Sequence, residues 1–183
     1  MADPPDAMIE TERLILRRWR EADVEPYVAM MADPQVADTL GGVLDRAQVG
    51  RSIARNEAAF EQQGIGRFAV ERRGDGRFLG HCGLMPIHES LPPAPGFEIG
   101  WALAKDAWGA GYASEAARAA IADAFARAEL AEVIAYTTVG NLRSQAVMAR
   151  VGLARTPARD FDHPLFEAGH PLCRHLMFVA NRP

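Results

Sequence analysis

Residues 108–115, with the sequence Trp-Gly-Ala-Gly-Tyr-Ala-Ser-Glu, constrain the fold of this chain more than any other segment. They lie between residues 97–103, which predict a strand, and residues 114–130, which have an apolar face at helical spacing. The two glycines allow a sharp turn and a close approach of the backbone to a ligand. The free N–H groups and the positive dipole end of the next helix would point at this loop. The segment therefore predicts a cradle for a pyrophosphate group.

Two other interpretations of this loop need to be considered. It could be only a tight strand–helix turn in which Ser114 is the N-cap of the helix, and a Gly-x-Gly turn alone does not exclude this. Gly109, Gly111 and Ser114 also nearly match the dinucleotide fingerprint G-x-G-x-x-G. That fingerprint requires an acidic residue about 20 positions further on, at the end of the next strand. Residues 136–140, Tyr-Thr-Thr-Val-Gly, contain none, so the dinucleotide interpretation is disfavoured.

The rest of the chain predicts an α/β fold with one mixed sheet. Strands that follow one another directly in sequence favour antiparallel pairing, and a later strand–helix–strand unit favours a parallel pair, with helices on both faces. Length favours one domain over residues 1–183. The expected strands are 11–19, 67–72, 78–84, 97–103, 133–138, 153–158 and 173–179, and the expected helices are 20–31, 47–63, 114–130 and 141–152.

Composition excludes several classes of protein. The net charge of −4 argues against binding to nucleic acid through phosphate neutralisation. No stretch approaches the roughly 18 apolar residues of a membrane span. Residues 1–10 are acidic and proline-rich, unlike a secretory signal, so we expect a cytoplasmic protein. Cys82 and Cys173 predict buried free thiols rather than a disulfide or metal site. The spacing of His163, His170 and His175 does not predict a metal site either.

Three segments in order resemble the GNAT superfamily of N-acetyltransferases. They are Phe-Glu-Ile-Gly-Trp-Ala-Leu at 97–103, Trp-Gly-Ala-Gly-Tyr-Ala-Ser-Glu-Ala at 108–116 and Val-Gly-Asn-Leu-Arg-Ser-Gln-Ala-Val-Met-Ala-Arg-Val-Gly-Leu at 139–153. The resemblance is strongest to the ribosomal-protein alanine N-acetyltransferases (RimJ/RimL type). It implies the acyl-CoA N-acyltransferase fold, with a mostly antiparallel twisted sheet. Trp108 departs from the family pattern, which begins the loop with Gln or Arg, so no phosphate contact is expected from that side chain.

The resemblance also implies a site that binds acetyl-CoA as co-substrate, without a metal. The strand 97–103 is expected to bulge and to separate from its neighbour, leaving free N–H groups, and Gly100 is compatible with such a bulge. The implied cofactor-binding residues are Trp101, Ala102, Leu103, Trp108, Gly109, Ala110, Gly111, Tyr112, Ala113, Ser114, Asn141 and Ser144.

Glu98 and Ser144 are the candidate catalytic residues. Acetyl transfer needs a neutral amine, and Glu98, on the strand that leads into the loop, is placed to act as general base. It could instead face solvent or pair with an arginine. In the family, a hydroxyl at the position of Ser144 often donates a proton to the CoA thiolate. Asn141 and Ser144 could also simply cap the helix that follows them.

The function implied is transfer of acetyl from acetyl-CoA to a primary amine by direct attack. The acceptor could be a protein N-terminal α-amine or a small-molecule amine, and the protein a monomer or a homodimer. The alternative is a non-catalytic acyl-CoA-binding module that has kept the loop and lost turnover.

Overall fold

The computed structural model describes residues 8–38 and 40–183. Its strands form one nine-stranded sheet in the order β1-β2-β3-β4-β5-β6-β9-β7, with β8 paired to β9. Residues 1–7, and with them most of the segment interpreted above as unlike a secretory signal, lie outside the described residues. The strands are β1 (Ile9–Glu10), β2 (Leu14–Arg17), β3 (Arg67–Arg72), β4 (Arg77–Pro86), β5 (Phe97–Leu103), β6 (Glu132–Thr138), β7 (Ala154–Arg155), β8 (Phe161–Asp162) and β9 (Arg174–Asn181).

The sheet confirms the expected mixed topology. Neighbouring strands pair antiparallel except β5 and β6, which run parallel. The predicted strand 97–103 has the observed bounds of β5. The strands β1 and β8 were not predicted, since two residues are too few to show any period.

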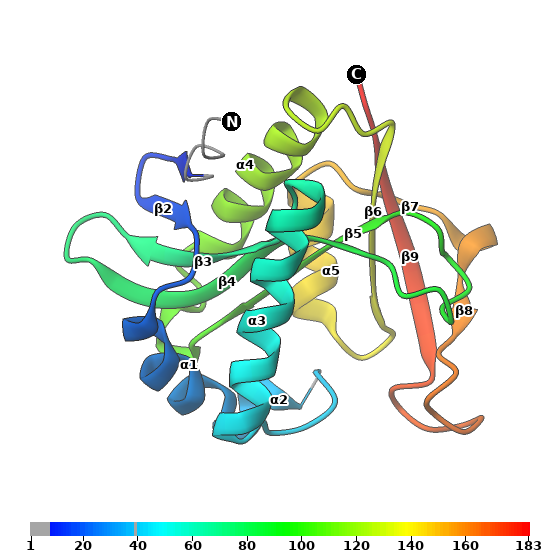
Figure 1. Cartoon of the computed structure of the whole chain (residues 1–183). Coiled ribbons are helices and arrows are strands. Elements are labelled where there is room, and N and C mark those ends of the chain that lie inside the picture. Colours follow the sequence, from blue (N-terminus) through cyan, green and yellow to red (C-terminus); the bar gives the residue numbers. More distant parts are fainter. Residues whose placement is uncertain (1–7, 39) are drawn as a thin grey trace.

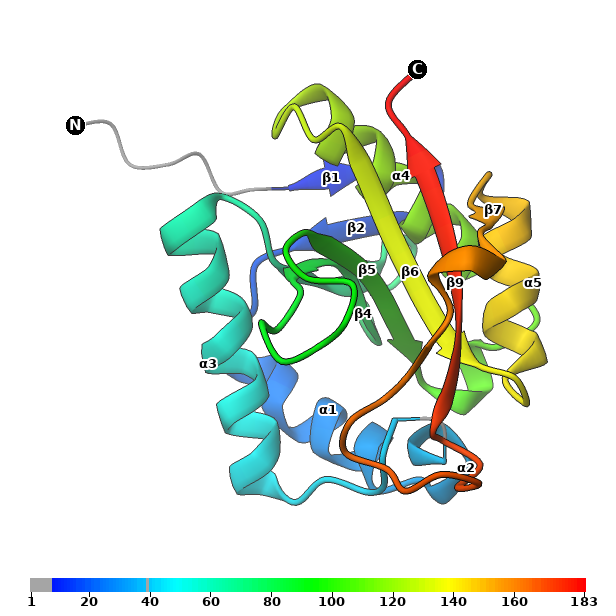
Figure 2. The same cartoon turned by 90° about the vertical axis from the view of Figure 1, so that its right-hand side faces the viewer.

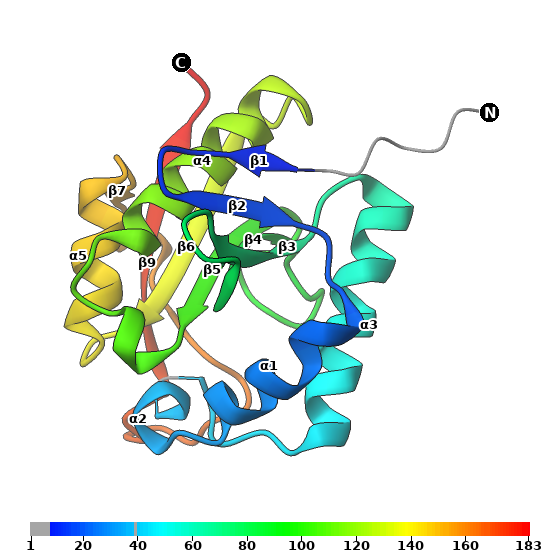
Figure 3. The same ribbon diagram turned by 90° about the vertical axis from the view of Figure 1, so that its left-hand side faces the viewer.

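Helices cover both faces of the sheet (Figures 1–3). The long helices α3 and α4 lie on opposite faces, with α1 and α2 beside α3 and with α5 beside α4. The helices are α1 (Val24–Met31), α2 (Pro34–Ala37), α3 (Arg46–Gln63), α4 (Tyr112–Ala126) and α5 (Leu142–Arg150), with 3₁₀ turns η1 (Glu21–Asp23), η2 (Lys105–Ala107) and η3 (Pro157–Arg159). None of the described helices is long and apolar enough to cross a membrane.

Each face of the sheet has its own apolar core. Ala117, Ile121 and Ala124 of α4 are buried against one face, as their helical spacing predicted. Tyr27 of α1 and Val49 of α3 are buried against the other. The sheet is thus fixed from both sides around the point where β5 and β6 meet.

The two parallel strands separate almost at once. In the described part of the chain they pair at one register position, Glu98 with Ile134. Beyond Glu98 the β6-facing edge of β5 has no partner strand there, so its peptide groups are free for a ligand. The expected bulge in β5 is wrong, because its register with β4 runs without a shift through Gly100. The register shift lies instead between β3 and β4, at Val70 and Glu71.

Candidate active site

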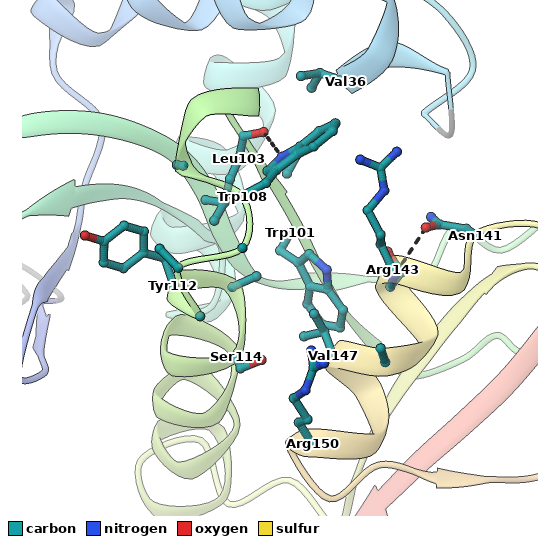
Figure 4. Close-up of a pocket in the computed structure, with 18 of the residues that line it drawn as sticks. Val36, Trp101, Leu103, Trp108, Tyr112, Ser114, Asn141, Arg143, Val147 and Arg150 are labelled. Atoms are coloured by element: carbon teal, nitrogen blue, oxygen red, sulfur yellow. Dashed lines mark hydrogen bonds between the residues drawn. The ribbon is translucent and has the colours of Figure 1, made fainter.

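A cavity of about 750 Å³ lies between the N-terminal part of α4 and one side of α5, beside the separated end of β5 (Figure 4). Its volume is in the range of small-molecule and cofactor sites. Every cofactor-binding residue expected from the sequence lines it, and Glu98 does not. The lining residues are Gln35, Val36, Leu40, Trp101, Ala102, Leu103, Ala107, Trp108, Gly109, Ala110, Gly111, Tyr112, Ala113, Ser114, Asn141, Leu142, Arg143, Ser144, Ala146, Val147 and Arg150.

The glycine loop presents the uncapped end of α4 to this cavity. Gly109 and Gly111 have φ angles of 78° and 85°, in the left-handed region that favours glycine. The helix begins at Tyr112 with Gly111 as N-cap, and no side chain caps it. The interpretation of Ser114 as N-cap is therefore wrong, because the helix starts two residues before Ser114. The amides of the first turn remain available to an anion.

The opposite wall is the start of α5, where Asn141 is the N-cap. Its Oδ1 accepts a hydrogen bond of 3.2 Å from the backbone N–H of Ser144. The idea that Ser144 also caps this helix is wrong, since its backbone N–H is the group that is capped. Within the described residues its hydroxyl has no hydrogen-bond partner, and Ser144 lines the cavity.

Two arginines that sequence reasoning missed also line this wall. Arg143 and Arg150 lie on the same side of α5 as Val147, four residues before it and three residues after it. This helical spacing could have indicated that the three side chains share one face of the helix. The Arg143 Cζ lies 4.1 Å from the centroid of the Trp108 ring. The Trp108 indole N–H donates to the Leu103 carbonyl at 2.8 Å, so Trp108 supports Arg143 by a cation–π contact. Among the described residues, the lining contains no carboxylate, and the cavity suits an anionic ligand.

Arg13 and Glu115 hold the glycine loop from behind. The Arg13 guanidinium donates to Glu115 Oε2 and to the Ala110 carbonyl, at 2.7 and 2.9 Å. Glu115 Oε1 also accepts from the Thr11 hydroxyl at 2.6 Å and from the Arg13 backbone N–H at 2.9 Å. Burial alone would raise the Glu115 pKa, but these bonds together hold it below its ordinary value. The turn between β1 and β2 thus fixes the loop conformation.

Replacing Glu115 with glutamine should weaken acetyl-CoA binding about tenfold, because Arg13, which bonds the Ala110 carbonyl of the loop, loses its charged partner. The free energy of unfolding should also fall by about 1–3 kcal/mol. Calorimetric titration and thermal denaturation measure the two effects. Glu132→Gln removes a carboxylate that pairs with Arg159 at 2.9 Å, away from the cavity, and is the matched control. A Glu115→Gln protein with wild-type affinity would show that the loop needs no such support.

Glu98 lies at the position where β5 pairs with β6. Its side chain is on the face of the sheet opposite α4. Strand alternation places it with Ala102, which packs in the core of α1 and α3, whereas Ile99 packs in the core of α4. Arg67 Nη2 donates to Glu98 Oε1 at 2.6 Å, so the arginine-paired alternative from the sequence describes the geometry. Both side chains keep 18–19% of their surface exposed.

The remaining reactive side chains show no sign of a metal or thiol centre. Within the described residues, no group of three His, Cys, Asp or Glu residues is arranged to hold a metal ion. Cys82 and Cys173 are buried and free, as the sequence predicted. Burial raises the pKa of the Cys82 thiol to about 12, so it stays protonated.

A sheet that opens beside a glycine loop and an uncapped helix start offers a binding site for the pyrophosphate group of a nucleotide-like ligand. Residues 13–154 match the family described as acetyltransferase (GNAT) domain, and this chain therefore belongs to the GNAT acetyltransferases. It is an acetyl-CoA-dependent acyltransferase, and enzymes of this family transfer acetyl groups to amines.

Known relatives and solved structures are similar over most of the chain. The uncharacterized protein YkkB of Bacillus subtilis is 29% identical over 144 residues, or 78% of this chain and 83% of YkkB. An acetyltransferase structure from Agrobacterium tumefaciens has 28% identity and a TM-score of 0.78, covering 99% of this chain and 96% of that one. The ribosomal-protein-S5-alanine acetyltransferase of Vibrio fischeri shares the fold at 15% identity, with a TM-score of 0.72 and 97% of both chains covered.

Proposed function

We propose that this protein transfers the acetyl group of acetyl-CoA to a primary amine by direct attack, with Glu98 as general base and Ser144 as proton donor to the leaving thiolate. The acceptor would be a protein N-terminal α-amine or a small-molecule amine. We further propose that residues 1–183 act as one domain in the cytoplasm, as a monomer or a homodimer. The observation that carries the activity is the cavity, with its uncapped helix end, left-handed glycines and two arginines.

The residues of the cavity fit the chemistry of acetyl-CoA. The amides of the loop and of the first turn of α4, together with Arg143, would hold the pyrophosphate. The free edge of β5 and Asn141 would bind the amides of the pantetheine arm. When bound, acetyl-CoA supplies an acetyl group already activated as a thioester.

Glu98 would accept a proton from the amine, and Ser144 would donate a proton to the thiolate. The acceptor is protonated at neutral pH, with a pKa near 8 for an α-amine and near 10 for an alkyl amine, so it must lose a proton. Glu98 would take this proton directly or through water. The carbon–nitrogen bond forms and the carbon–sulfur bond breaks. The thiolate receives a proton from the Ser144 hydroxyl, and the second proton that the nitrogen loses restores this hydroxyl. The thiolate is a fair leaving group, since thiol pKa values lie near 8.5.

A thiol-release assay with acetyl-CoA and a panel of amines tests the proposal. The expected result is release of free CoA that depends on both the amine and the folded protein. Acetyl-CoA binding without thiol release for any amine would show a non-catalytic binding module instead.

Ser144→Ala separates proton donation from helix capping. Because Asn141 caps α5, the variant should melt like the wild type. Its turnover should fall by about tenfold, less than the usual 10²-fold or more for proton transfer, since water can replace the hydroxyl. Asn141→Ala is the control and should lose about 1 kcal/mol of stability. Steady-state rates and melting temperatures measure both, and an unchanged rate in Ser144→Ala would remove Ser144 from the mechanism.

A further inference from the structure

A second set of polar side chains lies around Glu98, on the sheet face opposite α4, and the acetyl-CoA cavity does not use it. Arg67, Gly83 and Gly100 are direct cross-strand neighbours on β3, β4 and β5. A Cβ at Gly100 would lie 2.8 Å from Arg67 Nη2 and 3.0 Å from its Cζ. The Arg67 side chain therefore extends across β4 and lies directly on Gly100, where only glycine leaves room, and ends at Glu98.

The Arg67 guanidinium is only partly satisfied. It carries five N–H donors, and its one side-chain bond within the described residues is the 2.6 Å bond to Glu98. Its Nε is buried without any hydrogen-bond partner there. A buried donor of a charged group is rarely left unpaired, because desolvation is then not compensated. The Nη donors that Glu98 does not occupy, on a side chain that keeps 19% of its surface exposed, are available to a ligand oxygen close to Glu98.

Aromatic and histidine side chains from the C-terminal part of the chain stand beside this pair. His175 stacks on Phe161 with ring centroids 5.3 Å apart, and His163 lies 5.2 Å from His175. The ring centroid of Tyr136 lies within 5.6 Å of those of both Phe161 and His175. Burial raises the pKa of Tyr136, and the nearby Glu98 carboxylate raises it further. The Glu98 carboxylate acts on both His163 and His175, so these side chains of the paired β8 and β9 region lie near it.

Two arginines, Arg55 and Arg67, act on the buried side chains of this face. Arg67 neutralises the charge of Glu98. Burial lowers the pKa of His81 to about 3, and the positive charges of Arg67 and of Arg55 on α3 contribute to this decrease. Burial also lowers the pKa of His163 and of His175, so both imidazoles are neutral at pH 7. A polycation would be repelled here, whereas an anionic group would be attracted.

We propose that the acceptor is an α-amino acid, whose carboxylate binds Arg67 while its amine lies beside Glu98. This rests on the proposed function and names the substrate class of the same site. Arg67 and Glu98 are in direct contact, so the amine and the anionic group must be near neighbours in the substrate, as they are in an α-amino acid. The ammonium loses one proton to Glu98, and its nitrogen bonds to the acetyl carbon as the carbon–sulfur bond breaks. The second proton that the nitrogen loses passes by way of Ser144 to the leaving thiolate.

The test compares L-amino acids with their amides, which lack only the carboxylate charge, and with spermidine. For the preferred side chain, kcat/KM from thiol release should exceed that of the amide by about tenfold or more. Calorimetric titration of the same amino acid and amide into the protein without acetyl-CoA should show a similar ratio of affinities. Arg67→Gln should reduce both ratios to near one, with acetyl-CoA affinity unchanged, and Arg46→Gln should leave both ratios as they are.

Gly100→Ala provides a second variant that keeps the charge but displaces the guanidinium, and it should lower both ratios as well. Amides or spermidine used as well as amino acids would overturn the inference and leave the proposed function standing. Ratios that survive in Arg67→Gln would also overturn it. If no amine released thiol, the proposed function would fail, while the calorimetric ratios would still decide whether Arg67 binds a carboxylate.

Discussion

Replacing Gly111 with aspartate should abolish the stabilisation that acetyl-CoA gives to this protein. A ligand present at 100 times its dissociation constant stabilises the native state by roughly 2.7 kcal/mol, and this gain should vanish. The new carboxylate would lie at the uncapped start of α4, where it would occupy the amides that a pyrophosphate needs and repel its charge. Thermal denaturation with and without acetyl-CoA measures the effect.

Two matched variants separate charge from backbone strain. Gly111→Ala introduces the same backbone strain at φ 85° without a charge. It should therefore reduce the rise in melting temperature caused by acetyl-CoA without abolishing it. Gly76→Asp adds a carboxylate at another left-handed glycine, φ 69°, in the β3–β4 turn and should leave the shift intact. A folded Gly111→Asp protein with a full acetyl-CoA shift would show that the anion does not bind at this loop.

Glu98→Gln should lower turnover by about 10²-fold or more and leave acetyl-CoA affinity nearly intact. Glutamine keeps the shape of the side chain but cannot take a proton from the acceptor. Steady-state kinetics over a range of pH, with calorimetry for acetyl-CoA, measure the two quantities. The loss should shrink at pH values above the acceptor pKa, where the amine is already neutral.

That pH dependence separates a base from a structural partner of Arg67. If Glu98 served only to position Arg67, the decrease in activity of Glu98→Gln would be the same at every pH. It would appear mainly as a higher KM for the amine. Wild-type turnover of Glu98→Gln across the range would remove Glu98 from the mechanism.

Local signals were enough to predict much of the fold. The predicted strand 97–103 has the bounds of β5, and the αL glycine Gly64 ends α3 where the sequence indicated. The start of α4 was placed too late, because Ser114 is a common N-cap residue and the observed N-cap, Gly111, caps through no side chain. Strands of two residues, such as β1 and β8, have no pattern to detect.

The candidate site was predictable where it is continuous in sequence. Residues 108–114 line the cavity because one loop and one helix turn carry them all. Val36 lies on α2, far away in sequence, and nothing local marks it as part of the cavity. The pairing of Arg67 with Glu98 joins β3 to β5 across β4, so it depends on strand order and register. Tertiary placement of that kind leaves no trace in a single sequence.

Calorimetric titration of acetyl-CoA into the wild-type protein tests the central claim most directly. We expect saturable binding with one acetyl-CoA per chain, lost in Gly111→Asp and kept in Gly76→Asp. No binding heat and no thermal shift at millimolar acetyl-CoA would contradict it.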